Sequence, residues 1–308
     1  MAASELDASE IRYILGGAKA MLEGSDQRLN LLSGRTIVNL FFENSTRTRT
    51  SFELATRNLG GSVLNFAAGS SSVSKGETLI DTAMTIQAMR PHCLIVRHSS
   101  AGSPNVLARA LSIPVINAGD GFHEHPTQGL LDAFTIEQKL GSVSGKRIVI
   151  CGDIAHSRVA RSNIHVLRKL GASVAVCGPP TLLPPRMDVL GVDHAFRLEE
   201  LLPKADVVMM LRVQLERQNK MQIPTLNEYS RFWGLNRERA KLLKKSAIIL
   251  HPGPINRGVE LDPEVAEGAN SVILDQVSYG VVVRMATLAA VCNPAGFEAW
   301  LAEGGYRV

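Results

Sequence analysis

Short apolar segments rich in β-branched residues alternate with helical patterns along most of the 308-residue chain. The strand-like segments lie at 36–42, 62–67, 93–97 and 113–117 in the first half, and at 147–151, 173–177, 206–211 and 247–250 in the second. Helical patterns separate most of them. A further helical pattern at 7–23 precedes the first strand and opens with a candidate capping box of Asp7 and Glu10. This alternation predicts an α/β fold of parallel sheets flanked by helices.

The chain length and one internal break predict two domains. A chain of 308 residues exceeds what a single core usually organises. A long helical pattern at 127–140 ends in a glycine-bounded break, after which the strand–helix pattern starts again. We predict a first domain at 1–130, a second domain at 131–284, and a C-terminal helix at 285–308 that packs back on the first domain.

Composition favours a soluble globular protein that handles anions. The chain is 45% hydrophobic and 20% charged, with a net charge of +4. It has no dense Lys/Arg run and few Tyr or Trp residues, which argues against a nucleic-acid partner. No apolar run could span a bilayer or serve as a signal region, so we predict a cytoplasmic protein without membrane contact. The four scattered cysteines predict reduced thiols rather than disulfides or structural zinc.

The residues after the first predicted strand form a candidate anion site. The run Ser45-Thr46-Arg47-Thr48-Arg49 precedes a helical pattern marked by Phe52 and Ala55. Hydroxyl groups, guanidinium groups and backbone N–H groups at a helix start are suited to binding phosphate. The alternative is that Ser45 or Thr48 merely caps the helix while the arginines are solvated. The density of donors favours the phosphate site.

Polar residues also end or follow several other predicted strands. Ligands of parallel sheets bind beyond the carboxyl ends of the strands. Arginine is prominent among these residues, and its planar fork can hold a carboxylate or a phosphate through two hydrogen bonds, so we predict a polyanionic ligand. These residues are Arg97 and 120–125 in the first half, and 153–158, Arg212, Gln214 and 251–254 in the second.

Two long polar segments have a functional and a structural interpretation. Segment 70–78, which contains Lys75, is too small and polar for a core, and on its own it is typical of a flexible surface loop. Segment 215–236 is basic and aromatic with few helix signals, which predicts a long loop. That loop is either a functional lid or a variable surface loop.

Two short motifs allow alternative sites. His125 opens the long helix and is either a functional or a structural histidine; with His123 and Glu124 it suggests a metal site, but a convincing third ligand is missing. The turn at 151–153 could hold a nucleotide, yet the GxGxxG pattern is absent. We therefore predict neither a metal nor a dinucleotide.

Five stretches in order resemble motifs of the aspartate and ornithine carbamoyltransferase family. The last of them reads His-Pro-Gly-Pro, where some members carry leucine in place of Gly253 and the ornithine enzymes carry a cysteine-containing sequence. The resemblance covers essentially the whole chain and is closest to the catalytic chains of the aspartate enzymes. The five stretches are 45–49, 70–78, 125–128, 212–214 and 251–254.

The resemblance implies transfer of a carbamoyl group from carbamoyl phosphate to the α-amine of L-aspartate, as in de novo pyrimidine biosynthesis. It implies no cofactor and no metal. Catalytic roles would belong to Arg47, Thr48, Lys75 and His125. Carbamoyl phosphate would be bound by Ser45, Thr46, Arg47, Thr48, Ser71, Arg97, His125 and Gln128, aspartate by Lys75, Arg158, Arg212 and Gln214, and both substrates by the backbone of Gly253 and Pro254.

The resemblance also implies a homotrimer in which the segment with Lys75 reaches the active site of the neighbouring subunit. A larger assembly with regulatory or dihydroorotase chains is compatible with it. Two alternatives stay open: another acceptor such as ornithine, and a non-catalytic anion-binding subunit. Arg158 and Arg212 favour a second carboxylate over a cationic acceptor. The presence of Arg47, Lys75, His125 and Arg212 together argues against a non-catalytic subunit.

Overall fold

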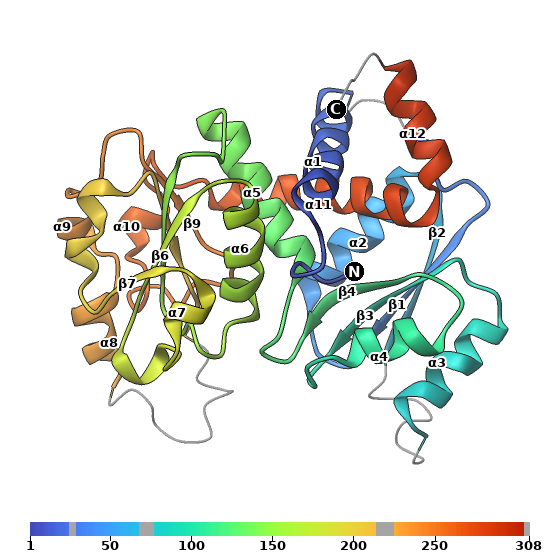
Figure 1. Cartoon of the computed structure of the whole chain (residues 1–308), viewed down its shortest axis with the longest axis horizontal. Coiled ribbons are helices and arrows are strands. Elements are labelled where there is room, and N and C mark those ends of the chain that lie inside the picture. The colour runs from blue at the N-terminus through green and yellow to red at the C-terminus, as the bar shows by residue number, and fades with distance from the viewer. Residues whose placement is uncertain (25–28, 68–76, 214–224, 305–308) are drawn as a thin grey trace. The chain divides into compact units, whose positions relative to one another are not determined.

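The computed structural model describes residues 1–24, 29–67, 77–213 and 225–304 (Figure 1). The chain forms two compact units, and each contains one parallel sheet flanked by helices, which confirms the predicted α/β fold. The divisions fall within α5 (Pro126–Leu140) and α11 (Ile273–Cys292). The first unit is Met1–Leu131 with Ser278–Val308, and the second is Asp132–Val277; the sequence placed the divisions after 130 and before 285.

The sheet of the first unit has four parallel strands in the order β2-β1-β3-β4. Helices α3 and α4 cover one face, and α1, α2, α11 and α12 lie on the other (Figure 1). Because both faces are covered, β1, β3 and β4 are buried along most of their length, whereas the edge strand β2 is partly exposed. The strands are β1 (Thr36–Phe41), β2 (Ser62–Ala67), β3 (Cys93–His98) and β4 (Val115–Asp120); the helices are α1 (Ala8–Glu23), α2 (Thr46–Asn58), α3 (Leu79–Ala88), α4 (Ser103–Ala110) and α12 (Pro294–Glu303).

The start of α1 follows directly from its sequence. The Asp7 carboxylate accepts the N–H of Glu10 at 2.8 Å, and the Glu10 carboxylate accepts the N–H of Asp7 at 2.9 Å. This reciprocal pair confirms the predicted capping box.

The sheet of the second unit has five parallel strands in the order β7-β6-β5-β8-β9. Alternate residues such as Val149, Cys151, Val208 and Met210 pack into one core beneath α9 and α10, while α6 lies on the other side of the sheet (Figure 1). The strands are β5 (Arg147–Cys151), β6 (Ser173–Cys177), β7 (Asp193–Ala195), β8 (Val207–Met210) and β9 (Ile248–Leu250); the helices are α6 (Arg158–Lys169), α7 (Met187–Leu190), α8 (Leu226–Trp233), α9 (Arg237–Ala240) and α10 (Pro263–Ala266), with short 3₁₀ turns at Pro180–Leu182, Leu198–Glu200 and Leu202–Lys204.

The predicted loop at 215–236 is wrong in its second half, where α8 forms. Thr225 caps this helix by accepting the N–H of Glu228 at 3.0 Å, and Tyr229 is fully buried. The spacing Thr-x-x-Glu was therefore a helix signal. Residues 214–224 lie outside the described part of the chain.

Two strands also differ from the prediction. β4 was expected at 113–117 but covers Val115–Asp120, because its last residues extend the pairing with β3 as far as His98. The edge strand β7 was not predicted, since its three residues are too short to show a periodic pattern.

All four cysteines are buried and free, although they lie in two close pairs. Cys151 and Cys177 face each other on β5 and β6, and hydrogen bonding between the two thiols together with burial raises the pKa of Cys151. The pKa of Cys93 is raised in the same way by the Cys292 thiol and by burial. Among the described helices, none is long and apolar enough to cross a membrane.

Because all four thiols are buried and structural buried cysteines are inert, we expect them to resist alkylation in the folded protein at pH 8. Counting modified thiols by mass spectrometry with iodoacetamide, in buffer and then in denaturant, checks this. We expect modification only after unfolding; rapid modification of any cysteine in the native state would contradict the burial described here.

Candidate functional site

The loop after β1 and the first turn of α2 contain the predicted phosphate-binding residues. Ser45 occupies the N-cap position of α2, but its side chain makes no capping hydrogen bond. Thr48 is buried in the first turn rather than at the cap, and Thr46 and Arg47 are exposed. Neither hydroxyl makes the side-chain capping hydrogen bond that the alternative expects, and the phosphate site stays a prediction. Ser45 lies at a helix start, where backbone N–H groups without helical partners are suited to an anion.

Arg97 lies at the carboxyl end of β3, next to β1 and β4. Its carbonyl accepts the N–H of Phe42 at 2.8 Å, and its Nη1 donates to the Ala118 carbonyl at 3.1 Å. Its Nε lies 3.4 Å from the Glu43 carboxylate. The guanidinium group is thus held at the same sheet edge as Ser45, because Arg97 and Phe41 are register partners in β3 and β1.

His125 and Gln128 lie at the start of α5, directly after β4. The His125 carbonyl accepts the N–H groups of Gln128 and Gly129 at 2.9 and 3.2 Å, which are the first bonds of the helix. Both predicted side chains are almost fully buried. Since β4 pairs with β3, the first unit brings the residues after β1, β3 and β4 to one edge of its sheet.

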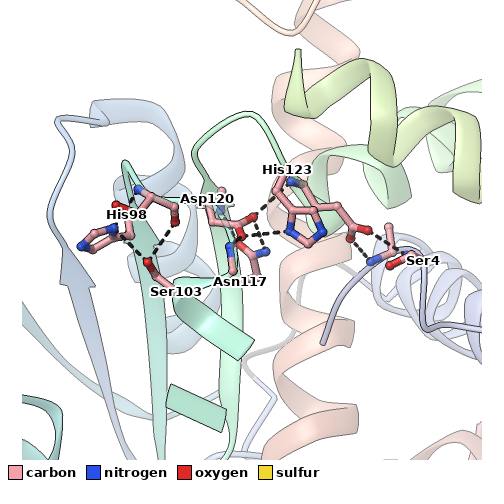
Figure 2. A network of polar contacts seen from close by, with 11 residues as sticks. Ser4, His98, Ser103, Asn117, Asp120 and His123 are labelled. Atoms are coloured by element: carbon pink, nitrogen blue, oxygen red, sulfur yellow. Dashed lines mark hydrogen bonds and ion pairs between the residues drawn. The ribbon is translucent and has the colours of Figure 1, made fainter. Parts of the chain in front are cut away.

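The fully buried carboxylate of Asp120 organises this edge (Figure 2). It accepts the N–H of Gly102 at 2.6 Å, the side-chain amide of Asn117 at 2.8 Å and the N–H of Glu124 at 3.1 Å. His123 contacts it at 3.0 Å. One carboxylate thereby joins the loop after β3 to the loop that ends at the predicted catalytic histidine.

The same loop is braced by a glycine and by the N-terminal segment. Gly121 has φ +48°, and a Cβ atom there would lie 2.8 Å from the Ser99 carbonyl oxygen, so only glycine fits. The Glu124 carboxylate accepts the N–H groups of Ala3 and Ser4. Glu124 precedes His125, so its fixed position also fixes the start of the histidine backbone.

We expect Asp120→Ala to lower the free energy of unfolding by about 3 kcal/mol, because several buried donors lose their acceptor. Urea unfolding measures this change. Asp188→Ala, which removes an exposed carboxylate paired with Arg186, is the matched control and should leave stability unaltered. Equal unfolding midpoints for Asp120→Ala and the unmodified chain would contradict the role given to Asp120.

The second unit gathers the predicted aspartate-binding residues at the carboxyl edge of its own sheet. Arg158 is the first residue of α6 and is nearly buried, and Ser157 caps this helix by accepting the Ala160 N–H at 3.1 Å. Arg212 follows β8, the neighbour of β5. Gly253 follows β9 with φ +65°, a conformation that favours glycine.

A buried carboxylate from the polar run predicted at 153–158 lies between β5 and Arg158. Asp153 accepts the N–H of His156 at 3.0 Å and contacts the His156 ring nitrogen at 2.9 Å. Burial raises the pKa of Asp153, while the contacts with His156 oppose the rise. The pair shapes the turn that delivers Arg158 to the sheet edge.

Three predicted residues, Ser71, Lys75 and Gln214, lie outside the described ranges. In the part of the chain that the structure describes, no three His, Cys, Asp or Glu side chains cluster as metal ligands do. His123 and Glu124, suggested as metal ligands with His125, contact Asp120 and the N-terminal segment instead.

Family models match both halves of the chain. Residues 1–138 match the model described as "Aspartate/ornithine carbamoyltransferase, carbamoyl-P binding domain", and residues 144–291 match "Aspartate/ornithine carbamoyltransferase, Asp/Orn binding domain". The chain belongs to the aspartate/ornithine carbamoyltransferase family. This finding confirms the resemblance seen in the five sequence stretches.

Carbamoyltransferases of known name are similar over almost the full chain. The aspartate carbamoyltransferase catalytic subunit of Myxococcus xanthus is 56% identical, covering 92% of this chain and 95% of its own. The catalytic subunit of Gluconacetobacter diazotrophicus is 57% identical, covering 83% of this chain and 80% of its own. The crystal structure of Trypanosoma cruzi aspartate transcarbamoylase with carbamoyl phosphate and aspartate has a TM-score of 0.86 and 33% identity, covering 94% of this chain and 95% of its own.

The carbamoyltransferase domain models follow the two sheets. The residues that match the carbamoyl-phosphate model include β1 to β4, with Arg47, Arg97 and His125. Those that match the aspartate/ornithine model include β5 to β9, with Arg158 and Arg212. Each set lies at the carboxyl edge of one parallel sheet, where ligands of such sheets bind.

Proposed function

We propose that the chain transfers the carbamoyl group of carbamoyl phosphate to the α-amine of L-aspartate, giving N-carbamoyl-L-aspartate and phosphate. The observation that carries the choice of acceptor is the placement of Arg158 and Arg212 after the neighbouring strands β5 and β8. Two guanidinium groups suit a substrate with two carboxylates and would repel the ammonium side chain of ornithine. The names of the relatives that are 56% and 57% identical support the same acceptor.

Carbamoyl phosphate is assigned to the first domain, 1–130 with 285–308. Ser45, Thr46 and Thr48 supply hydroxyl or backbone donors at the start of α2, and Arg47 and Arg97 balance the phosphate charge. Ser71 and Lys75 complete this set by family resemblance. The solved Trypanosoma cruzi enzyme with carbamoyl phosphate, 33% identical, supports the ligand class.

Aspartate is assigned to the second domain, 131–284. Arg158 holds the α-carboxylate, and Arg212 with Gln214 and Lys75 holds the side-chain carboxylate. The carbonyl groups of Gly253 and Pro254 receive the amine and the carbamoyl nitrogen. The crystal structure of the Trypanosoma cruzi enzyme with N-(phosphonacetyl)-L-aspartic acid, at 32% identity and a TM-score of 0.85, supports a phosphate-like and a dicarboxylate group as ligands.

The reaction then needs only positioning and charge stabilisation. The deprotonated α-amine attacks the carbamoyl carbon and forms a tetrahedral intermediate. Arg47, Thr48 and His125 stabilise its oxyanion, where one placed donor contributes about 3 kcal/mol, and Gln128 holds the carbamoyl nitrogen. The bond from carbon to the phosphate oxygen breaks, and the departing phosphate takes the proton that the amine loses. Each step uses side chains of this protein, with no covalent enzyme intermediate.

Phosphate release measured with a single acceptor tests the proposal. With carbamoyl phosphate and L-aspartate we expect sustained release that stops when either substrate is omitted. L-Ornithine in place of aspartate should give only the background rate. Release with ornithine but not with aspartate would show that ornithine is the acceptor. Absence of release with either amino acid would support the non-catalytic alternative.

We further propose a cytoplasmic homotrimer that serves pyrimidine biosynthesis. Several exposed apolar side chains on the first unit are compatible with association: Leu64 of the edge strand β2 is 60% exposed, and Leu54 of α2, Ile80 and Met84 of α3 are also exposed. The main support for the trimer is the family resemblance. Regulatory or dihydroorotase chains are compatible with the trimer.

Mixing inactive chains tests the shared site. Arg47→Ala and Lys75→Ala homotrimers should each be inactive, but trimers that contain both chains should regain part of the activity, since some sites then combine intact residues from two chains. The assay follows mixing under conditions of verified subunit exchange. No recovery would contradict a site shared between subunits.

A further inference from the structure

A fully buried histidine–carboxylate pair lies directly behind the predicted substrate turn of the second unit. The Nε2 atom of His251 and the Oε1 atom of Glu260 are 3.2 Å apart, and both side chains are inaccessible to solvent. The N–H of Gly253 donates to Nδ1 of His251 at 2.8 Å. Nδ1 therefore carries the lone pair, and Nε2 carries the proton that His251 donates to Glu260.

Glu260 also ties the turn to the segment that carries Arg212. Its Oε1 accepts the N–H of Asn256 at 2.6 Å, so one oxygen receives two donors from the turn. The side-chain amide of Asn256 donates to the Val213 carbonyl at 3.0 Å. The residues after β9 are thus linked to the residue next to the predicted aspartate-binding arginine.

The other end of the turn is linked to the helix of Arg158. The His251 N–H donates to Oε1 of Gln276 at 2.9 Å, and Gln276 donates to the Asp132 carboxylate at 2.7 Å. The second oxygen of Asp132 accepts the amide of Asn163, on α6, at 2.7 Å. One buried polar network within the second unit therefore links the residues after β8 and β9 to α6, the helix that begins with Arg158.

We propose that Glu260 is a positioning residue for the acceptor substrate: through His251 and Asn256 it sets the Gly253–Pro254 turn relative to Arg212. This inference rests on the proposed function. A buried ion-pair-like contact contributes little net stability compared with apolar packing, so stability alone does not explain its presence. The contact instead fixes the carboxylate oxygen to which the turn is hydrogen-bonded, and substrate alignment requires such fixed positions.

The contacts of Glu260 allow the position of its hydrogen-bond-accepting oxygen to be tested separately from its negative charge. The Oε2 atom of Glu260 makes no hydrogen bond among the described residues, whereas Oε1 accepts both donors. Glu260→Gln keeps an oxygen at the Oε1 position and loses the charge. Glu260→Asp keeps the charge and withdraws the oxygen by one bond length. If Glu260 acts by positioning, Glu260→Gln should therefore preserve its role and Glu260→Asp should impair it.

Steady-state kinetics with both substrates tests this. We expect Glu260→Asp and Glu260→Ala to raise the KM for aspartate roughly 10- to 100-fold, with the dissociation constant of carbamoyl phosphate unchanged. Glu260→Gln should stay within about threefold of the unmodified chain. Glu267→Ala, which removes an exposed carboxylate bound to Arg257 at 2.6 Å, is the matched control and should have no effect.

Hydrogen–deuterium exchange of the 251–257 peptide gives a readout that needs no turnover. Exchange should accelerate in Glu260→Asp and remain as in the unmodified chain in Glu260→Gln. If the unmodified chain fails to use aspartate, the proposed function fails while this readout still decides the positioning role. The inference is overturned if Glu260→Asp behaves as the unmodified chain does, if Glu260→Gln is as impaired as Glu260→Asp, or if carbamoyl phosphate binding weakens in parallel.

Discussion

We expect Arg47→Ala to lower kcat by about 100- to 1000-fold, the usual cost of removing one donor to a developing oxyanion. The Arg47 side chain is exposed in the first turn of α2, so its removal leaves the core intact. The loss should therefore appear in kcat without a change in the unfolding midpoint. Steady-state kinetics and urea unfolding of the same preparation separate the two effects.

Arg57→Ala is the matched control for this prediction. Arg57 lies in the last turn of the same helix, where it pairs with Glu53 at 2.8 Å and is 63% exposed. Removing it deletes the same charge from α2 without touching the anion site. An equal loss of kcat in both variants would show that the charge of the helix matters rather than the position of Arg47.

Arg212→Ala should raise the KM for aspartate about 100-fold, because the side-chain carboxylate loses a bidentate, charge-assisted partner. Arg212→Lys should remain impaired, since an ammonium group cannot reproduce the planar fork. Carbamoyl phosphate binding, assigned to the other unit, should not change. Kinetics at saturating carbamoyl phosphate and calorimetry with carbamoyl phosphate alone measure the two quantities.

Arg186→Ala provides the control in the second unit. Arg186 is exposed and pairs only with the neighbouring Asp188 among the contacts described, at 2.7 Å. It should leave both substrates unaffected. An unchanged KM for aspartate in Arg212→Ala would remove the main argument for a dicarboxylate acceptor and would favour the ornithine alternative.

The fold was largely predictable because most of its strands are buried on both faces and therefore show as apolar runs, as in 147–151 and 173–177. The elements that escaped prediction lack this signal. β7 has three residues at a sheet edge, two of them exposed, and α8 buries little more than Tyr229. Its start was encoded in the cap at Thr225, a local signal that counts for more than hydrophobic periodicity in so short a helix.

The placement of the candidate residues was predictable as far as they lie at or just after strand ends. Ser45, Arg97, His125 and Arg212 all do, and the sheet order brings each group to one edge. The polar runs that contain Asp120 and Asp153 were named from the sequence, but the contacts of these carboxylates were not predictable. Asp120 is recognised by donors that include the distant Gly102, and these meet only in the folded chain. Buried acids are defined by their partners, and the partners are set by tertiary structure.

The destination of a labelled carbamoyl group tests the account most directly. Carbon-labelled carbamoyl phosphate is incubated with the chain and equal concentrations of L-aspartate and L-ornithine, and the products are separated. We predict label in N-carbamoyl-L-aspartate, in a one-to-one ratio with released phosphate. Label in carbamoylated ornithine, or label that remains in carbamoyl phosphate, would contradict the account.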